Sequence, residues 1–178
     1  MVGVPQNFIG YQFAHSGNAY AGIINLSTKD WNYQEHIQGK LIVPLKKDSL
    51  YEVSAYVSLA DSSTYYYNTL QFGFTGGSQE FSHRCINGYY VMYCNGNCIT
   101  ITDDSSGLFK DSKSWRLIKG IYKAKGGEEY ITIGLFKDTY NRYMHKRALK
   151  YNKINNITVD EEADAYYYID DVCVKLMK

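Results

Sequence analysis

The chain has 178 residues, with 19 Lys and Arg against 18 Asp and Glu, so its formal net charge is +1. This balance provides no long-range field for a polyanion and argues against a general nucleic-acid or membrane-surface binder. Hydrophobic residues make up 45% of the chain and charged residues 21%, which excludes a disordered protein. No apolar run approaches the roughly 20 residues that a membrane-spanning helix needs. We therefore expect one folded domain with its own core.

The composition favours strands over helices. The chain contains 19 Tyr and 15 Gly but only 2 Pro, and aromatic rings pack well on a pleated surface. The clearest alternation places Tyr51, Val53, Ala55, Val57 and Leu59 on one face of a strand. In chain order, we expect strands within 19–25, 36–45, 51–61, 70–74, 91–102, 115–124, 130–137 and 166–176. About eight or nine short strands, separated by turns, predict an all-β antiparallel sandwich of the jelly-roll type.

Turn signals join some of these strands. Asn95-Gly96 predicts a hairpin within 91–102, because both residues tolerate the positive φ of tight turns. Gly126-Gly127 predicts a turn that joins 115–124 to 130–137 as a pair. The segment 138–164 breaks the pattern of short strands and is expected to be a surface insertion in the single domain 1–178.

A series of short phrases covers most of the chain. They are Gly10-Tyr11-Gln12, the segments 15–22, 35–41 and 51–61, Pro44-Leu45, Trp115 with 120–122, Gly126-Gly127-Glu128, 131–136 and 168–172. In this order and spacing they resemble the galactose-binding-like jelly-roll domain of carbohydrate-binding modules. They are most similar to the version that precedes OmpA-type domains in Bacteroidota envelope proteins.

The resemblance implies a sugar-binding protein of the cell envelope or of the extracellular space. Residues 1–8 have neither a basic leader nor an apolar stretch typical of a signal peptide, so this location comes from the resemblance. In the family a further strand precedes Gly10-Tyr11-Gln12, and a sandwich without it would expose a strand edge or take a strand from a partner. The Tyr65-Tyr66-Tyr67 run, the hairpin with its two cysteines and the insertion 138–164 depart from the family pattern.

Asp170 and Asp171 are adjacent on the last expected strand, so we expect one carboxylate inside the sandwich and one in solvent. A buried carboxylate needs a cation or several hydrogen-bond donors, and Ca²⁺ prefers carboxylate and carbonyl oxygens. By resemblance, a structural calcium site would consist of Asp170 or Asp171 with Ser16 and Asn18. Alternatively, both carboxylates cap a strand end or bind backbone amides.

Exposed aromatic rings can stack on the apolar face of a sugar, while amide and guanidinium groups hydrogen-bond its hydroxyls. The candidates for this role are Trp31, Asn32, Tyr33, Tyr56, Tyr65, Tyr66, Tyr67, Gln71, Tyr140, Arg142 and Tyr143. For any single tyrosine, packing in the core or at its rim with a solvated hydroxyl is the other interpretation. Trp115 begins an expected strand and is expected in the core.

Four cysteines are too few for a disulfide scaffold but enough for one or two bridges. Cys94 and Cys98 flank three residues, and a hairpin loop there would bring them opposite each other as a disulfide candidate. Free thiols are an alternative, as is a zinc site with His83 and Cys85, whose spacing does not match a standard zinc pattern. Cys173 is expected to be a small buried apolar residue.

The sequence gives little support for catalysis. His15 and Ser16 are neighbours in the chain, which does not place a base on a nucleophile, and no nucleophile elbow, zinc-protease motif or phosphate loop occurs. A jelly-roll hydrolase would need two carboxylates across a cleft, whereas the glutamates are scattered. We therefore do not expect an enzyme.

We expect a non-catalytic carbohydrate-binding-like module of a bacterial envelope or secreted protein, with a glycan as its partner. The alternative is a structural or adhesin-like module that binds other envelope proteins and has no sugar site. A glycan binder should show a groove with two or more coplanar exposed rings and polar neighbours. An assembly module should show a flat apolar patch or an unpaired strand edge.

Overall fold

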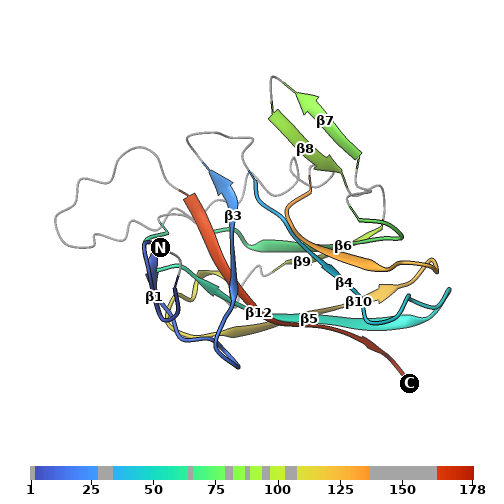
Figure 1. Ribbon diagram of the computed structural model, residues 1–178, viewed down its shortest axis with the longest axis horizontal. Helices are drawn as coiled ribbons and strands as arrows, with labels where there is room; N and C mark the ends of the chain where they lie inside the picture. The colour runs from blue at the N-terminus through green and yellow to red at the C-terminus, as the bar shows by residue number, and fades with distance from the viewer. Residues whose placement is uncertain are drawn as a thin grey trace.

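The structure, a computed structural model, describes residues 3–27, 34–63, 66–78, 82–86, 89–93, 97–102, 108–136 and 164–178. Two four-stranded antiparallel sheets form its body (Figure 1). The first sheet has the order β10-β5-β12-β3, formed by Arg116–Lys123, Leu50–Leu59, Asp164–Leu176 and Ala21–Ser27. The second has the order β4-β11-β6-β9, formed by Ile37–Lys40, Tyr130–Gly134, Thr69–Thr75 and Cys98–Thr102. The prediction of an all-β antiparallel sandwich is confirmed.

Smaller elements lie around these two sheets. A short hairpin joins β1 to β2, and a second antiparallel pair joins β7 to β8. Their bounds are Gln6–Asn7, Gly10–Tyr11, Ser82–Ile86 and Tyr89–Tyr93. In the described part of the chain, the helical content is one turn of 3-10 helix, η1, at Leu108–Lys110.

The core lies between the two sheets and follows from the alternation of β5. Val53, Ala55 and Val57 are fully buried, whereas the residues between them lie half-exposed on the outer face. The central strand β6 supplies the opposing side, with Phe72 and Phe74 fully buried. Because side chains alternate across a strand, one apolar face per strand is enough to build this core.

The predicted hairpin within 91–102 does not form. Among the described strands, β8 pairs with β7, and β9 pairs with β6, where Ile99 lies opposite Phe72. Ile99 and Ile101 pack so closely on β10 that a Cβ added at Gly120 would come within 3.2 Å and 3.4 Å of their side chains. Long-range apolar packing therefore outweighs the local turn preference of Asn95-Gly96.

The turn at Gly126-Gly127 forms as predicted, with φ values of +97° and +86°. It does not join a hairpin, however, because β10 and β11 belong to different sheets. The turn therefore carries the chain from one layer of the sandwich to the other. The predicted insertion 138–164 falls, apart from Asp164, outside the described residues.

Candidate functional site

The second half of β12 is an open strand edge. β12 pairs with β3 only as far as Ile169, which lies opposite Ala21. From Cys173 to Leu176 the strand pairs with β5 alone, and the described residues provide no backbone partner on its other side. The N–H and C=O groups of such an edge can accept a further strand.

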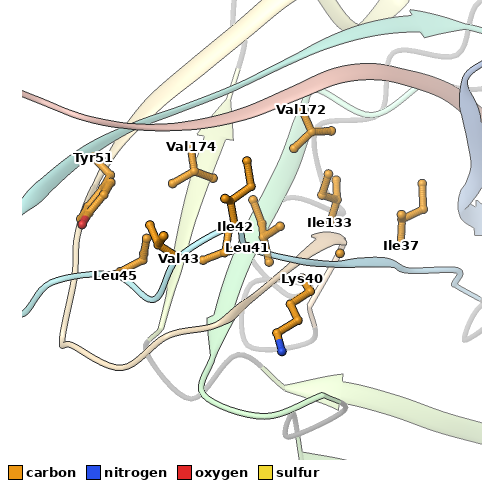
Figure 2. A pocket seen from close by; sticks show the side chains of 12 residues that line it. Ile37, Lys40, Leu41, Ile42, Val43, Leu45, Tyr51, Ile133, Val172 and Val174 are labelled. Atoms are coloured by element: carbon orange, nitrogen blue, oxygen red, sulfur yellow. The ribbon is translucent and has the colours of Figure 1, made fainter.

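An apolar groove lies beside this edge, between the two sheets (Figure 2). At one end the sheets are tied together, because Glu35 N donates to Ile24 O at 2.9 Å and Ile24 N donates to the Glu35 carboxylate at 2.7 Å. Beyond this tie, β4 and the residues after it run opposite the second half of β12. The space between them is a cavity of about 320 Å³, at the lower end of the range for ligand sites, roughly 300–1,000 Å³.

The walls of the groove are mainly aliphatic. Val172 and Val174 line it from β12, and Ile42 and Val43 line it from the segment after β4 (Figure 2). Ile42 is completely exposed and Val43 is 66% exposed. Sequence analysis missed these residues, although 41–43 is a run of three apolar residues where a strand with one buried face should alternate.

The two polar side chains at the groove have partners of their own. The Tyr51 hydroxyl accepts a 3.0 Å hydrogen bond from Lys46 N. The Lys40 ammonium lies 3.8 Å from the Glu129 carboxylate and points away from the aliphatic side chains in Figure 2. The groove therefore offers hydrocarbon surface beside an open strand edge.

A β-bulge at Asp171 sets which side chains of β12 face the groove. Asp170 lies opposite Tyr56 and Cys173 lies opposite Ser54, so two residues of β12 share one position of β5. Asp171 has a φ of +46°, and bulges of this kind often use a residue with positive φ. The extra residue turns Val174 inward, opposite Val53.

The bulge also corrects two predictions. Cys173 is exposed rather than buried, because it now lies on the outer face of the sheet. Neither Asp170 nor Asp171 points into the core, since Asp170 is only partly buried and Asp171 is exposed. The expectation of one buried carboxylate assumed an uninterrupted alternation, which the extra residue breaks.

Both carboxylates hold the N-terminal segment against the sheet. Asp170 accepts hydrogen bonds from the backbone N–H groups of His15 (2.8 Å), Ser16 (3.3 Å) and Asp171 (2.8 Å). Asp171 accepts one from the Ser16 hydroxyl and lies beside His15 Nδ1, both at 2.6 Å. The Ser16 hydroxyl and the His15 ring hold the pKa of Asp171 below its usual range. The His15 ring stacks on Tyr56 with a centroid distance of 3.5 Å.

This arrangement does not fit the calcium site implied by the resemblance. Ser16, Asp170 and Asp171 do come together, but all four carboxylate oxygens already lie against hydrogen-bonding groups. Asn18 is exposed and makes no hydrogen bond to either carboxylate. Within the described ranges, no group of three or more His, Cys, Asp or Glu is placed to hold a metal ion. Asp170 instead binds backbone amides, as in the other interpretation, and Asp171 lies against the side chains of Ser16 and His15.

Only part of the predicted glycan-binding set lies in the described residues. Tyr67 and Gln71 are buried, 6% and 1% exposed, so neither can touch a ligand at the surface. Gln71 instead accepts a 2.7 Å hydrogen bond from Phe136 N. Tyr66 packs half-buried against the core, and Tyr56 stacks on His15. The remaining candidates lie outside the described residues: Trp31, Asn32, Tyr33, Tyr65, Tyr140, Arg142 and Tyr143.

Other aromatic side chains are exposed near the N-terminus. Tyr11 is 51% exposed and Phe13 64% exposed, but their rings are perpendicular, at 89°. They do not form the coplanar pair expected for a sugar site. Trp115 is half-buried beside this region and lies outside the core. Its indole N–H donates a 2.8 Å hydrogen bond to Phe13 O. The close spacing of aromatic residues along 8–13 was the available sequence signal.

Cys98 is disulfide-bonded, whereas Cys173 carries a free thiol. The predicted partner Cys94 and the zinc candidates His83 and Cys85 have no described side chains. The bridge between Cys94 and Cys98 therefore stays a prediction.

Comparisons with protein-family models, with curated proteins and with solved structures give no match to this chain. Within the described ranges, no helix has the length and apolarity that crossing a bilayer requires.

Proposed function

We propose that the chain is a non-catalytic binding module that acts by protein–protein contact through the groove between β4 and β12. Its occupant is an extended segment that adds to the free edge of β12 and places aliphatic side chains in the groove. The observation that carries this proposal is the combination of an unpaired strand edge with exposed Ile42, Val43 and Val172 at one site.

The chemistry of the groove supports a peptide strand as the occupant. An added strand pairs its backbone with the edge, and alternate side chains fill pockets beside it. Burial of an exposed aliphatic side chain such as Ile42 is favourable by about 1.5–3 kcal/mol. Such contacts, together with the backbone pairing, oppose the cost of ordering an extended segment, which is about 1–2 kcal/mol per residue.

The described residues favour protein over sugar as the partner. A sugar needs ring faces for stacking and free polar groups for its hydroxyls, whereas the groove is aliphatic and its polar side chains Lys40 and Tyr51 have partners. The exposed rings of Tyr11 and Phe13 are perpendicular. Glycan binding stays a prediction for the aromatic candidates outside the described residues.

A selection experiment tests the proposal. The full chain is immobilised and used to select from a displayed library of random dodecapeptides, and it is also probed on a glycan array. We expect the selected peptides to share alternating aliphatic residues and to lose binding at least about tenfold with Ile42→Asp. Since Ile42 is completely exposed, this variant should fold as the wild type does.

A matched control is Leu117→Asp, which changes an exposed aliphatic residue on β10, a strand that does not line the groove. Peptide binding should be the same for this variant and the wild type. Glycans that bind the wild type while no peptide is selected would overturn the proposal, as would selected peptides that bind equally to Ile42→Asp.

A further inference from the structure

We infer that the extended segment is the β12 strand of a second copy of this chain, added antiparallel to the free edge around Cys173. This inference rests on the proposed function, because it names the partner of the same edge. Antiparallel pairing of two identical edges follows a two-fold axis, so one residue of each copy must lie opposite itself.

The residues of β12 are self-complementary in this register. With Cys173 opposite Cys173 of the second copy, Val172 lies opposite Val174 on the inner face, twice. Continuing the same register, Asp171 lies near Lys175 of the second copy on the outer face, again twice. Opposite charges and apolar pairs at such positions stabilise a pair of strands.

The exposure of these side chains in the single chain fits this arrangement. Lys175 is exposed and forms no ion pair with the described residues, and the Asp171 side chain remains 36% exposed beside His15. Val172 is 42% exposed although it lines the groove. The second copy would cover the apolar groups and supply Lys175 with an acidic partner.

Further apolar groups lie where the second copy would dock. Leu176 and Met177 are 46% and 40% exposed, and Met177 N is bonded to Leu50 O, so they continue the edge toward the C-terminus. A stable symmetric interface buries about 1,200–2,000 Å² in total, more than five-residue strands provide alone. The exposed residues Ile42 and Val43 in the adjoining groove supply additional surface.

Only the pairing of two identical copies places Cys173 opposite itself, so substitutions at this residue test for self-association. Cys173→Asp and Cys173→Lys each place two like charges opposite each other, and each should weaken dimerisation at least about fivefold. An equal mixture of the two variants should restore association, since opposite charges then meet. Cys173→Ser is the matched control and should dimerise as the wild type does. Because residue 173 is exposed, all three variants should fold.

Sedimentation equilibrium of the full chain, from low to high concentration, measures the association. We expect the wild type to shift from a mass of 20.4 kDa toward twice that value. A wild type that stays monomeric would overturn the inference, as would a dimer in which Cys173→Asp and Cys173→Lys behave like Cys173→Ser. If the wild type stays monomeric and selected peptides bind in the groove, the inference fails and the proposed function stands. If the wild type stays monomeric and no peptide is selected, both fail.

Discussion

The hydroxyl of Tyr122 donates a 2.8 Å hydrogen bond to Oε1 of Glu128, beside the turn between β10 and β11. The same carboxylate accepts hydrogen bonds from the backbone N–H groups of Lys125 (2.6 Å) and Gly126 (2.8 Å). Burial alone would raise the pKa of Glu128, but these hydrogen bonds stabilise the ionised form more strongly and hold its pKa below the usual range. Burial and the neighbouring Glu128 raise the pKa of Tyr122, which keeps its hydroxyl a donor.

Glu128 should make the fold less stable in acid. Because its pKa is lower in the folded chain than the ordinary value of about 4.3, the ionised form adds stability that is fully present above that value. This stability is lost as the pH falls through the folded pKa. Glu128→Gln should therefore flatten the fall in the free energy of unfolding below about pH 5, measured by urea denaturation. The control is Glu129→Gln, and equal profiles for both variants would contradict the prediction.

Removal of the Tyr167 hydroxyl should destabilise the sandwich. This hydroxyl is buried, accepts a 2.9 Å hydrogen bond from Tyr67 N and lies 2.8 Å from Phe109 O. Tyr167→Phe leaves these groups inside the protein without that hydroxyl, which should cost about 1–3 kcal/mol in the free energy of unfolding. Tyr130→Phe, at a half-buried position, should change it by less than about 0.5 kcal/mol. Chemical denaturation compares the two, and equal losses would refute the assignment.

The two glycines of the interlayer turn should differ in their tolerance of alanine. Both have positive φ, which costs a residue with a Cβ about 1–2 kcal/mol. A Cβ at Gly126 would also come within 2.8 Å of the Lys47 Cβ and 3.1 Å of its Cα, whereas nothing lies within 4 Å of one at Gly127. Gly126→Ala should therefore lower the thermal midpoint more than Gly127→Ala. An equal decrease would show that Lys47 gives way without cost.

Calcium should not raise the thermal stability of this chain. The oxygens of Asp170 and Asp171 already lie against hydrogen-bonding groups, so a cation would have to displace these contacts. We expect the same melting temperature in calcium and in EDTA, measured by differential scanning calorimetry. A rise in calcium that disappears in Asp170→Asn would instead support the calcium site implied by the resemblance.

Sequence patterns predicted those elements whose structure depends mainly on residues close by in the chain. The alternation from Tyr51 to Leu59 identified β5, because a strand with one buried face needs an apolar residue at every second position. The Gly126-Gly127 turn was also predictable, since φ values of this sign favour glycine. Such signals do not say which strand lies beside which, so the pairing of β9 with β6 could not be read from Asn95-Gly96.

The candidate site was less predictable because it depends on contacts between distant residues. Gln71 looks like a polar ligand group in the sequence, but the central position of β6 buries it beside Phe136. The open edge of β12 exists because its pairing with β3 ends at Ala21. The extent of this pairing cannot be predicted from the local sequence. The sequence correctly placed Ser16 near Asp170 and Asp171, but it wrongly predicted that one carboxylate is buried. A β-bulge cannot be recognised from the alternation of apolar and polar residues.

The extra residue at Asp171 changes which residues of β12 face the core. Before it, odd-numbered Tyr167 and Ile169 face the core; after it, even-numbered Val174 and Leu176 lie opposite the inward residues of β5. Without this bulge, uninterrupted alternation from Ile169 would turn Cys173 and Lys175 toward the interior in place of Val174 and Leu176. The bulge thus keeps a thiol and an ammonium group in solvent and places Val174 beside the groove.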